Sequence, residues 1–508
     1  MIKFHTAIFL CFISGAILPL AFSPFHWSFI AFISPAILFW CSHHLTLKQS
    51  TLCGFLFGFA YLGVGVSWIQ ISINLFGNMN WFWASLITLL FILFLAIFYA
   101  SIPFVAKRFF HSSGIVSLCF VYPLLWVLFE WIRGWVLTGF PWLTIGYSQT
   151  NNHLSGIASV MGVYGLSFCI VIISGVIATL LLPKSVKNVI FTIPSLLFFV
   201  MMFSVGQLTW VEPSVDKKSL EVALIQANIE QKIKWKANER YRTMLLYDDL
   251  TRQIQQADII IWPENAIPAF YDQLKNNYLK PLILDAQRKN AELLVGLPVW
   301  GDQRKKYYNS MIHLSEKSAN IYKKRHLVPF GEFMPLASIL KPILSYFHIP
   351  MSAFSTGSSD ESPLLFIKNQ WIGLSICYED AFGQDIIKAL PKASFLVNAS
   401  NDAWFGHSLA PHQHLEMAQM RAIETGRYLV RATSTGISAI INEKGKILKQ
   451  SPQFEQHILQ GKIIPFKGKT PYVMLGNKLI IALIFFLLLT IKLSEPFICS
   501  NKTHPLAV

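Results

Sequence analysis

Charged residues are scarce in this sequence. Only 14% of its 508 residues are Asp, Glu, Lys or Arg, against about 25% in an ordinary soluble protein. The shortage falls in the first ~210 residues and the last ~35, where apolar runs reach the length needed to cross a bilayer. The segment between them has an ordinary soluble composition. The shortage therefore argues against a wholly soluble protein and predicts a polytopic membrane protein with one large aqueous domain.

Acidic residues are scarcer than basic ones, with 27 Asp and Glu against 42 Lys and Arg and a formal net charge of +15. A basic balance can indicate nucleic-acid binding, but the sequence has no arginine-rich stripe and no nucleic-acid motif. We interpret the excess as lysine beside membrane spans plus a basic aqueous domain near anionic lipid. No nucleic-acid partner is expected.

Cysteine is almost absent from the aqueous segment. Of the seven cysteines, Cys377 is the only one between Cys169 and Cys499. The spacing gives neither a disulfide framework nor a set of metal ligands, so we expect no metal and no cofactor. A lone thiol is either a buried inert residue or a nucleophile. On the thiol alone, the inert interpretation is favoured, because free cysteine is a frequently buried residue type.

The apolar runs predict about eight transmembrane helices. The first resembles a signal peptide, but it has no convincing small-residue cleavage site and further spans follow at once. Seven spans fall within a transmembrane domain over residues 1–210, and one C-terminal span follows the aqueous domain. The predicted spans are 6–22, 26–42, 51–73, 81–106, 114–136, 155–182, 188–208 and 477–494.

Lysine and arginine are missing from alternate short loops, namely those near 23–25, 74–80 and 137–154. The intervening segments carry basic residues, for example Lys48 and Lys107. The positive-inside rule then places both termini in the cytoplasm and the aqueous domain outside. For a multi-pass protein of the bacterial inner membrane, this predicts a periplasmic domain over residues 219–467.

Strand and helix patterns alternate through the aqueous segment, which predicts an α/β layered domain. No internal repeat is found. Helices are expected at 238–256, 272–290 and 411–426. Strands are expected at 220–228, 257–264, 291–298, 307–314, 320–324, 364–377, 395–400, 429–433, 437–442 and 458–464.

Three reactive side chains, Glu264, Lys324 and Cys377, stand at the ends of predicted strands or in adjoining loops. A thiol with a pKa near 8.5 needs help to become a thiolate. A carboxylate in an apolar site can accept its proton, and a nearby ammonium can stabilise an oxyanion. Each residue also has an ordinary interpretation, as a surface acid, part of a solvated basic run and a core thiol.

Three segments around these residues resemble the signature segments of the nitrilase, or carbon–nitrogen hydrolase, superfamily. They are Trp-Pro-Glu264, Lys324-Arg-His-Leu-Val-Pro-Phe-Gly-Glu332 and Cys377-Tyr-Glu379. The resemblance implies a Glu–Lys–Cys catalytic triad on a four-layer α-β-β-α sandwich. The longer motifs His326-Leu-Val-Pro-Phe-Gly-Glu-Phe-Met-Pro335 and Ser400-Asn-Asp-Ala-Trp-Phe-Gly406, together with eight spans, are similar to the apolipoprotein N-acyltransferase branch.

That branch implies a two-step acyl transfer. Cys377 would take an acyl chain from the sn-1 ester of a phospholipid, typically phosphatidylethanolamine, with Glu264 as base. Lys324 and the backbone N–H of Tyr378 would hold the oxyanion. The acceptor would be the α-amine of the S-diacylglyceryl cysteine of a lipoprotein, which completes lipoprotein maturation.

The resemblance also implies supporting residues. Glu332 and Glu379 would position Lys324 and Glu264. Trp235 matches a tryptophan in a substrate loop of the family, and Asn309, Trp404 and Phe405 are further candidates for substrate binding.

Two other functions fit part of the pattern. A membrane-anchored amidase could use the same triad, but it needs water at the thioester, which an acyltransferase must exclude. A transporter with an outer domain would show inverted repeats and mid-membrane charges, and neither is clear. The apolar stretch Phe333–Phe354 favours exclusion of water. We expect it to lie on the membrane as a lid over Cys377, with a cap on the sandwich core as the alternative.

Overall fold

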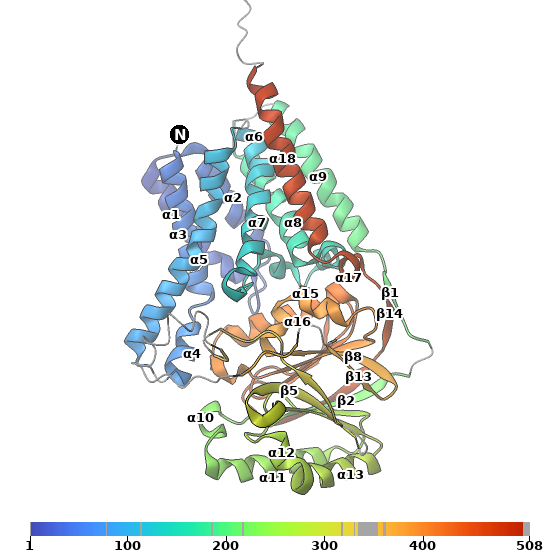
Figure 1. Ribbon diagram of the computed structural model, residues 1–508. Coiled ribbons are helices and arrows are strands. Elements are labelled where there is room, and N and C mark those ends of the chain that lie inside the picture. The colour runs from blue at the N-terminus through green and yellow to red at the C-terminus, as the bar shows by residue number, and fades with distance from the viewer. Residues whose placement is uncertain are drawn as a thin grey trace, which may run out of the picture. The chain divides into compact units, whose positions relative to one another are not determined.

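The computed structural model divides into two compact units (Figure 1). The helical unit comprises residues 1–67, 85–208 and 475–508, and the α/β unit comprises residues 68–84 and 209–474. The residues that the structure describes are 2–77, 79–111, 114–183, 186–215, 218–315, 319–329, 331–333, 354–358 and 362–500. Most of the stretch expected to form a lid, 334–353, lies outside these ranges.

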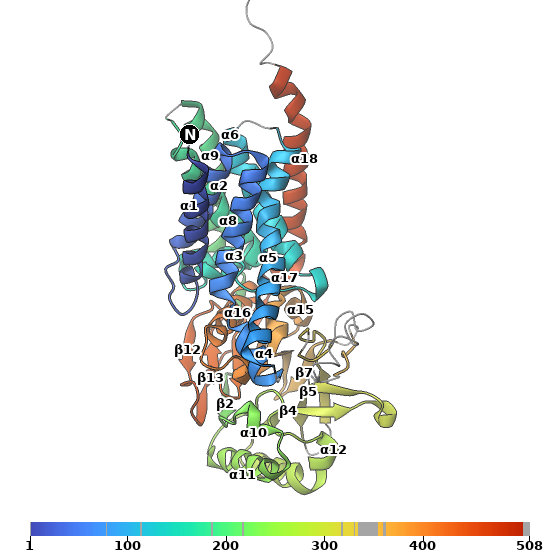
Figure 2. The ribbon, with the colours of Figure 1, turned by 90° about the vertical axis from the view of Figure 1, so that its left-hand side faces the viewer.

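The helical unit is built from long apolar helices, several of which run side by side (Figure 2). Four helical segments are long and apolar enough to cross a membrane, or five if one bent pair counts as a single span. Two more apolar helices, α2 and α9, are shorter. The predicted total of eight is not reached by this measure within the described residues. The helices are α1 (Phe4–Ile17), α2 (Ile30–His44), α3 (Leu47–Gly65), α5 (Trp81–Phe109), α6 (Gly114–Val116), α7 (Tyr122–Arg133), α8 (Ala158–Leu180), α9 (Val186–Gly206) and α18 (Lys478–Ser500).

Small residues let these helices approach closely. A Cβ added at Gly15 of α1 would lie 2.3 Å from the carbonyl oxygen of Phe57 in α3. At Gly58 of α3 it would lie 2.7 Å from the side chain of Tyr99 in α5. Glycine at such contacts is the usual device of helix packing in membranes, where apolar burial gives little driving force between helices.

The predicted span 51–73 is not one straight helix. Helix α3 ends at Gly65, and α4 (Ile69–Phe76) follows after a bend of 53°. Trp68 marks the change, because its indole Nε1 donates to Gln413 at 3.1 Å within the α/β unit. Residues 68–84 therefore belong to the α/β unit, although their composition reads as membrane-spanning.

Two six-stranded sheets form the centre of the α/β unit. Their strand orders are β13-β2-β3-β4-β5-β6 and β12-β11-β10-β9-β8-β7. The strand pairs β2-β3, β3-β4, β8-β9 and β9-β10 are parallel. The first sheet comprises β2 (Leu220–Gln226), β3 (Ile259–Ile261), β4 (Glu292–Trp300), β5 (Tyr307–Leu314), β6 (Ala319–Lys323) and β13 (His457–Ile463). The second comprises β7 (Leu364–Ile367), β8 (Gln370–Ile376), β9 (Phe395–Ser400), β10 (Leu429–Thr433), β11 (Ala439–Ile441) and β12 (Ile447–Gln450).

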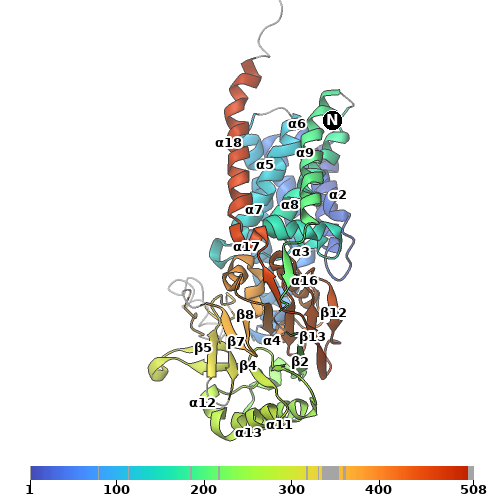
Figure 3. The same ribbon diagram turned by 90° about the vertical axis from the view of Figure 1, so that its right-hand side faces the viewer.

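Helices cover the outer face of each sheet, which gives four layers in the order α-β-β-α (Figure 1, Figure 3). Alternation along β2 shows why: Val222 and Leu224 face the second sheet, whereas Ala223 and Ile225 face helices. Successive side chains of a strand point to opposite faces, so a strand apolar on both faces must be covered on both. The covering helices are α11 (Ala237–Gln253) and α13 (Lys280–Arg288) on one side, and α15 (Gly383–Ile386) and α16 (Ala410–Thr425) on the other.

Some elements differ from the sequence prediction. The expected helix 272–290 is interrupted by a π-helical turn, Lys275–Leu279, ahead of Pro281 in α13. Proline has no N–H to donate, so a regular helix is disfavoured there. The sequence did not predict β12 or the small sheet, because their exposed residues show no clear alternation. The small sheet pairs β1 (Val211–Pro213) with β14 (Phe466–Gly468).

Candidate active site

Cys377 follows directly after β8 and occupies a left-handed backbone conformation, with a φ of +50°. A non-glycine residue rarely adopts this conformation, and the strain persists only where surrounding contacts impose it. One such contact is the backbone N–H of Ile376, which donates to Glu379 Oε2 at 2.7 Å. The turn places the thiol at the carboxyl end of β8, which is paired on both sides by β7 and β9, and α/β sheets gather reactive groups at such strand ends.

The carboxylate of Glu379 joins the turn at Cys377 to the chain after Lys324. Its Oε1 accepts hydrogen bonds from the backbone N–H groups of Arg325 at 2.7 Å and His326 at 3.1 Å. Its Oε2 also accepts from the hydroxyl of Tyr322 at 2.8 Å. Glu379 therefore contacts the backbone that follows Lys324, and its predicted positioning role stays a prediction.

Lys324 lies between two carboxylates. Its Nζ is 3.1 Å from Glu264 Oε1 and 2.8 Å from Glu332 Oε2, and its side chain is 1% exposed. Asn309 in β5 completes the arrangement, since its Nδ2 donates to Glu264 at 2.6 Å and to Glu332 at 2.9 Å. Asn309 is fully buried, and its amide bridges the two carboxylates; its predicted role in substrate binding stays a prediction.

Burial decides the protonation of the thiol. Burial raises the pKa of Cys377 well above its usual value, Glu264 raises it further, and Lys324 opposes the shift. For Lys324, burial lowers the pKa but Glu264 and Glu332 together raise it well above its usual value. The resting site therefore holds a neutral thiol beside an ammonium paired with two carboxylates. A thiol in this state needs a base before it can act as a nucleophile.

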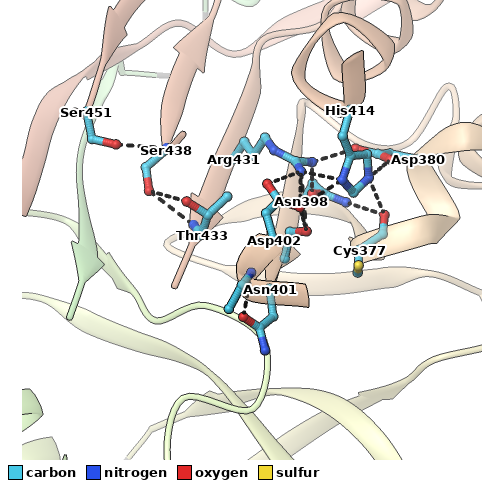
Figure 4. Close-up of polar contacts among 12 residues, drawn as sticks. Cys377, Asp380, Asn398, Asn401, Asp402, His414, Arg431, Thr433, Ser438 and Ser451 are labelled. Atoms are coloured by element: carbon cyan, nitrogen blue, oxygen red, sulfur yellow. Dashed lines mark hydrogen bonds and ion pairs between the residues drawn. The ribbon is translucent and has the colours of Figure 1, made fainter. Parts of the chain in front are cut away.

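A second charged cluster lies behind Cys377 and was missed by the sequence analysis (Figure 4). His414 of α16 approaches Asp380 at 2.8 Å and Asp402 at 2.9 Å, and Arg431 of β10 pairs with both aspartates at 2.8 and 3.1 Å. All four side chains are almost fully buried. We call Asp380, Asp402, His414 and Arg431 the rear cluster. Asp402 within the motif 400–406 was the signal in the sequence, since its three partners come from three other segments.

The predicted aromatic residues lie on loops of the same unit. Trp235 follows α10 (Gln231–Lys234) and is 51% exposed. Trp404 and Phe405 form the short helical turn η10 (Asp402–Phe405) and are half-buried. The ring of Phe405 meets that of Trp68 edge-on, with 4.8 Å between centroids.

Lys234 was also missed. It is 1% exposed, and its Nζ has no hydrogen-bond partner within the described part of the chain. Burial lowers the pKa of Lys234 to about 8, although the Glu264 carboxylate opposes the shift. A buried ammonium without a partner is costly, which makes this residue unusual for a structural lysine.

Family models and curated relatives match both the helical and the α/β part of the chain. A family model described as apolipoprotein N-acyltransferase N-terminal domain matches residues 14–176, and one described as carbon-nitrogen hydrolase matches residues 221–465. An apolipoprotein N-acyltransferase of Methylococcus capsulatus is 39% identical over 471 residues, which is 93% of each chain. One of Coxiella burnetii is 40% identical and covers 95% of this chain and 99% of its own.

The solved structures are more distant. A carbon-nitrogen hydrolase from Helicobacter pylori aligns with 48% of this chain and 89% of its own, at 15% identity and a TM-score of 0.36. The assignment accordingly depends on the sequence relatives, which match the helical and the α/β parts together. The chain belongs to the apolipoprotein N-acyltransferase family.

Proposed function

We propose that this acyltransferase moves an acyl chain from a membrane phospholipid to a lipoprotein through a thioester on Cys377. The observation that carries the proposal is the arrangement of Glu264, Lys324 and Cys377 at the ends of β3, β6 and β8. The Glu264–Lys324 ion pair and the thiol act on each other electrostatically. The Glu379 carboxylate ties the two segments that carry Lys324 and Cys377.

In the first step, Glu264 accepts the thiol proton while the sulfur of Cys377 attacks the ester carbonyl carbon. The carbonyl oxygen becomes an oxyanion, held by the Lys324 ammonium and the backbone N–H of Tyr378. When the C–O bond breaks, the leaving glycerol oxygen takes the proton from Glu264. The products are a lysophospholipid and an acyl thioester on Cys377.

In the second step, the acceptor's α-amine attacks the thioester carbonyl carbon. The amine gives up a proton to Glu264, and collapse of the oxyanion breaks the C–S bond and returns that proton to the sulfur. An amide is formed and the enzyme is restored. A covalent intermediate thus divides one acyl transfer between two lipid-anchored substrates into two simpler displacements.

This chemistry suits a phospholipid as donor, because its acyl chains are esters. It suits the S-diacylglyceryl cysteine of a lipoprotein as acceptor, because that residue offers an amine. Donation from the sn-1 position of phosphatidylethanolamine is part of the proposal. So is water exclusion by the apolar stretch 333–354, with Trp235, Trp404 and Phe405 beside the lipid. The amidase alternative is not favoured, because the relatives that match this chain over nearly their whole length are named apolipoprotein N-acyltransferases.

Around the triad we assign positioning roles. Glu332 fixes the Lys324 ammonium, and Asn309 holds both carboxylates by its amide. Glu379 holds the backbone on either side of the site. These contacts leave the reactive atoms of Glu264, Lys324 and Cys377 with little freedom, as an efficient oxyanion site requires.

The proposed arrangement in the membrane has eight spans, both termini in the cytoplasm and a catalytic domain over 219–467 in the periplasm. It is supported by the several apolar helices and by the basic residues of alternate loops. Helices α2, α9 and α18 would supply the spans beyond those that are long enough on their own.

The test is to incubate the purified full-length protein with phospholipid labelled in its sn-1 acyl chain. We expect hydroxylamine-sensitive label on Cys377, released to a diacylglyceryl lipopeptide with a free amine. Cys377→Ala should take up no label. Label that persists in the Ala variant, or release of free fatty acid in place of transfer to the peptide, would refute the proposal.

A further inference from the structure

The peptide group between Cys377 and Tyr378 is bound at its carbonyl end by two buried side chains. Asn398 Nδ2 and His414 Nε2 each lie 3.3 Å from the carbonyl oxygen of Cys377 (Figure 4). The N–H of the same peptide group belongs to Tyr378, the backbone donor in the proposed oxyanion site. The rear cluster therefore contacts the far end of a catalytic dipole.

Both contacts are donations to that oxygen. Arg431 donates to Asn398 Oδ1 at 2.6 Å, which fixes the amide so that Nδ2 faces Cys377. His414 Nε2 has two near neighbours in the described structure, Asp380 Oδ1 at 2.8 Å and the Cys377 carbonyl oxygen. Both are acceptors, and the other ring nitrogen, Nδ1, lies 2.7 Å from Arg431 Nη2, a donor, and 2.9 Å from Asp402 Oδ1. Nε2 therefore carries a proton both in the neutral tautomer that suits these contacts and in the imidazolium.

The ring also carries charge. Burial and Arg431 lower the pKa of His414, but Asp380 and Asp402 outweigh them and raise it to about 9. At neutral pH His414 is therefore positively charged. Asp402 favours that charge, because Arg431 and His414 outweigh burial and hold the pKa of Asp402 well below its usual range. A positive donor on an amide oxygen draws electrons from the N–H and strengthens it as a donor, since hydrogen bonds in a chain polarise one another.

We propose that His414, oriented by the rear cluster, strengthens the Tyr378 N–H as an oxyanion donor by polarising the peptide group between Cys377 and Tyr378. This role is beyond the triad and depends on the proposed function, because it requires an oxyanion at that N–H. His414 touches no reacting atom and acts as a positioning and polarising residue. Asn398 contributes an uncharged donor to the same oxygen.

The experiment compares wild type with His414→Gln in the full-length protein, with the rate of Cys377 acylation by labelled phospholipid as the readout. Glutamine keeps an uncharged donor of similar reach. Removing an oxyanion donor outright costs about 10²–10³ in rate. Polarisation changes the strength of a hydrogen bond by about 10–30%, so weakening the donor should cost about two- to eightfold. We expect this loss in the maximal acylation rate, with the half-saturating phospholipid concentration unchanged.

The pH profile separates this role from a purely structural one. Asp380, Asp402, Arg431, Cys377 and Lys324 are present in both proteins, so their titrations largely cancel in the ratio of the wild-type rate to the Gln rate. Only the wild type loses a charge from residue 414, with a pKa of about 9. The ratio should therefore be constant near neutral pH and fall as the pH rises through 9.

The matched control is Ser438→Ala, which breaks another buried polar cluster beside the same strand, β10. Its hydroxyl accepts from the Thr433 N–H at 3.1 Å and donates to Gln226 at 2.8 Å, with no contact to Cys377 in the described structure. We expect it to acylate at the wild-type rate even where its thermal stability is reduced.

Two results would overturn the role of His414. One is a rate ratio that does not change between pH 7 and pH 10, and the other is an equal loss of rate in Ser438→Ala at equal thermal stability. Label that persists in Cys377→Ala would instead refute the proposed function itself. Label confined to Cys377 together with a flat ratio would refute only the polarising role.

Discussion

Replacing Lys234 by methionine removes a buried ammonium that has no hydrogen-bond partner in the described structure and keeps a side chain of similar length. Burial lowers the pKa of this lysine from 10.5 to about 8. At about 1.4 kcal/mol per pKa unit, the charged form costs the folded state about 3 kcal/mol. Lys234→Met should therefore be more stable than wild type at neutral pH.

The sign of the pH dependence follows from linkage. Below pH 8 both the folded and the unfolded protein carry the proton, so the full cost is present. Between pH 8 and 10.5 the unfolded state binds the proton more tightly, and the stability of the wild type rises with pH. The advantage of the methionine variant should accordingly be largest at pH 6–7 and shrink above pH 8.

Thermal unfolding of the detergent-solubilised protein at pH 6.5, 8 and 9.5 measures the effect. A domain of this size shifts its Tm by about 2–4 °C per kcal/mol, so we expect a gain of about 6–12 °C at pH 6.5. Lys236→Met is the control, because Lys236 is exposed two residues further on. Its Tm should not change. A methionine variant at position 234 that is no more stable at pH 6.5, or whose gain does not depend on pH, would refute the reasoning.

Three further predictions concern the site and the membrane topology. Glu332→Gln puts an amide N–H among the donors of Lys324 and should slow Cys377 acylation roughly 10- to 150-fold, since a hydrogen bond to a charged group contributes about 1.5–3 kcal/mol. The control Glu292→Gln, which breaks a 2.7 Å pair with His313 elsewhere in the first sheet, should acylate normally. Lys324→Arg should abolish acylation, because a planar guanidinium does not replace a compact ammonium between two carboxylates, and burst kinetics like those of the wild type would remove Lys324 from the mechanism. A reporter fused at residue 300 should give a periplasmic signal, and a cytoplasmic signal would reverse the proposed orientation.

The sequence indicated most of the layered fold because strand and helix periodicities differ and each parallel strand is apolar on both faces. Glu264, Lys324 and Cys377 stood out as polar residues at the ends of apolar runs, and the structure has them at strand ends; their catalytic roles stay a prediction. The break between α3 and α4 could not be predicted from the sequence, because a straight span and a bent helix held by Trp68 have the same apolar composition.

Contacts between distant segments were beyond prediction from one sequence. Asp380, Asp402, His414 and Arg431 come from separate elements, and each alone resembles an ordinary surface residue. Asn309 lies within strand β5, and a polar side chain in a strand can face either solvent or a buried carboxylate. Only the pairing of β5 with β4 and β6 brings its amide between Glu264 and Glu332.

The state of the thiol connects the site's electrostatics to its place in the cell. Because burial and Glu264 raise the pKa of Cys377, the resting enzyme holds a neutral thiol, which is a poor target for oxidants and disulfides. In the proposed mechanism, the sulfur becomes negatively charged only as Glu264 takes the proton, and the charge then moves to an oxyanion that faces Lys324. In an oxidising periplasm, a permanent thiolate would be lost to oxidation. A thiol that is deprotonated only during attack on a bound ester is reactive toward oxidants for a much shorter time. A lone cysteine is thus compatible with the proposed compartment, provided that its reactivity depends on bound substrate as the proposed mechanism requires.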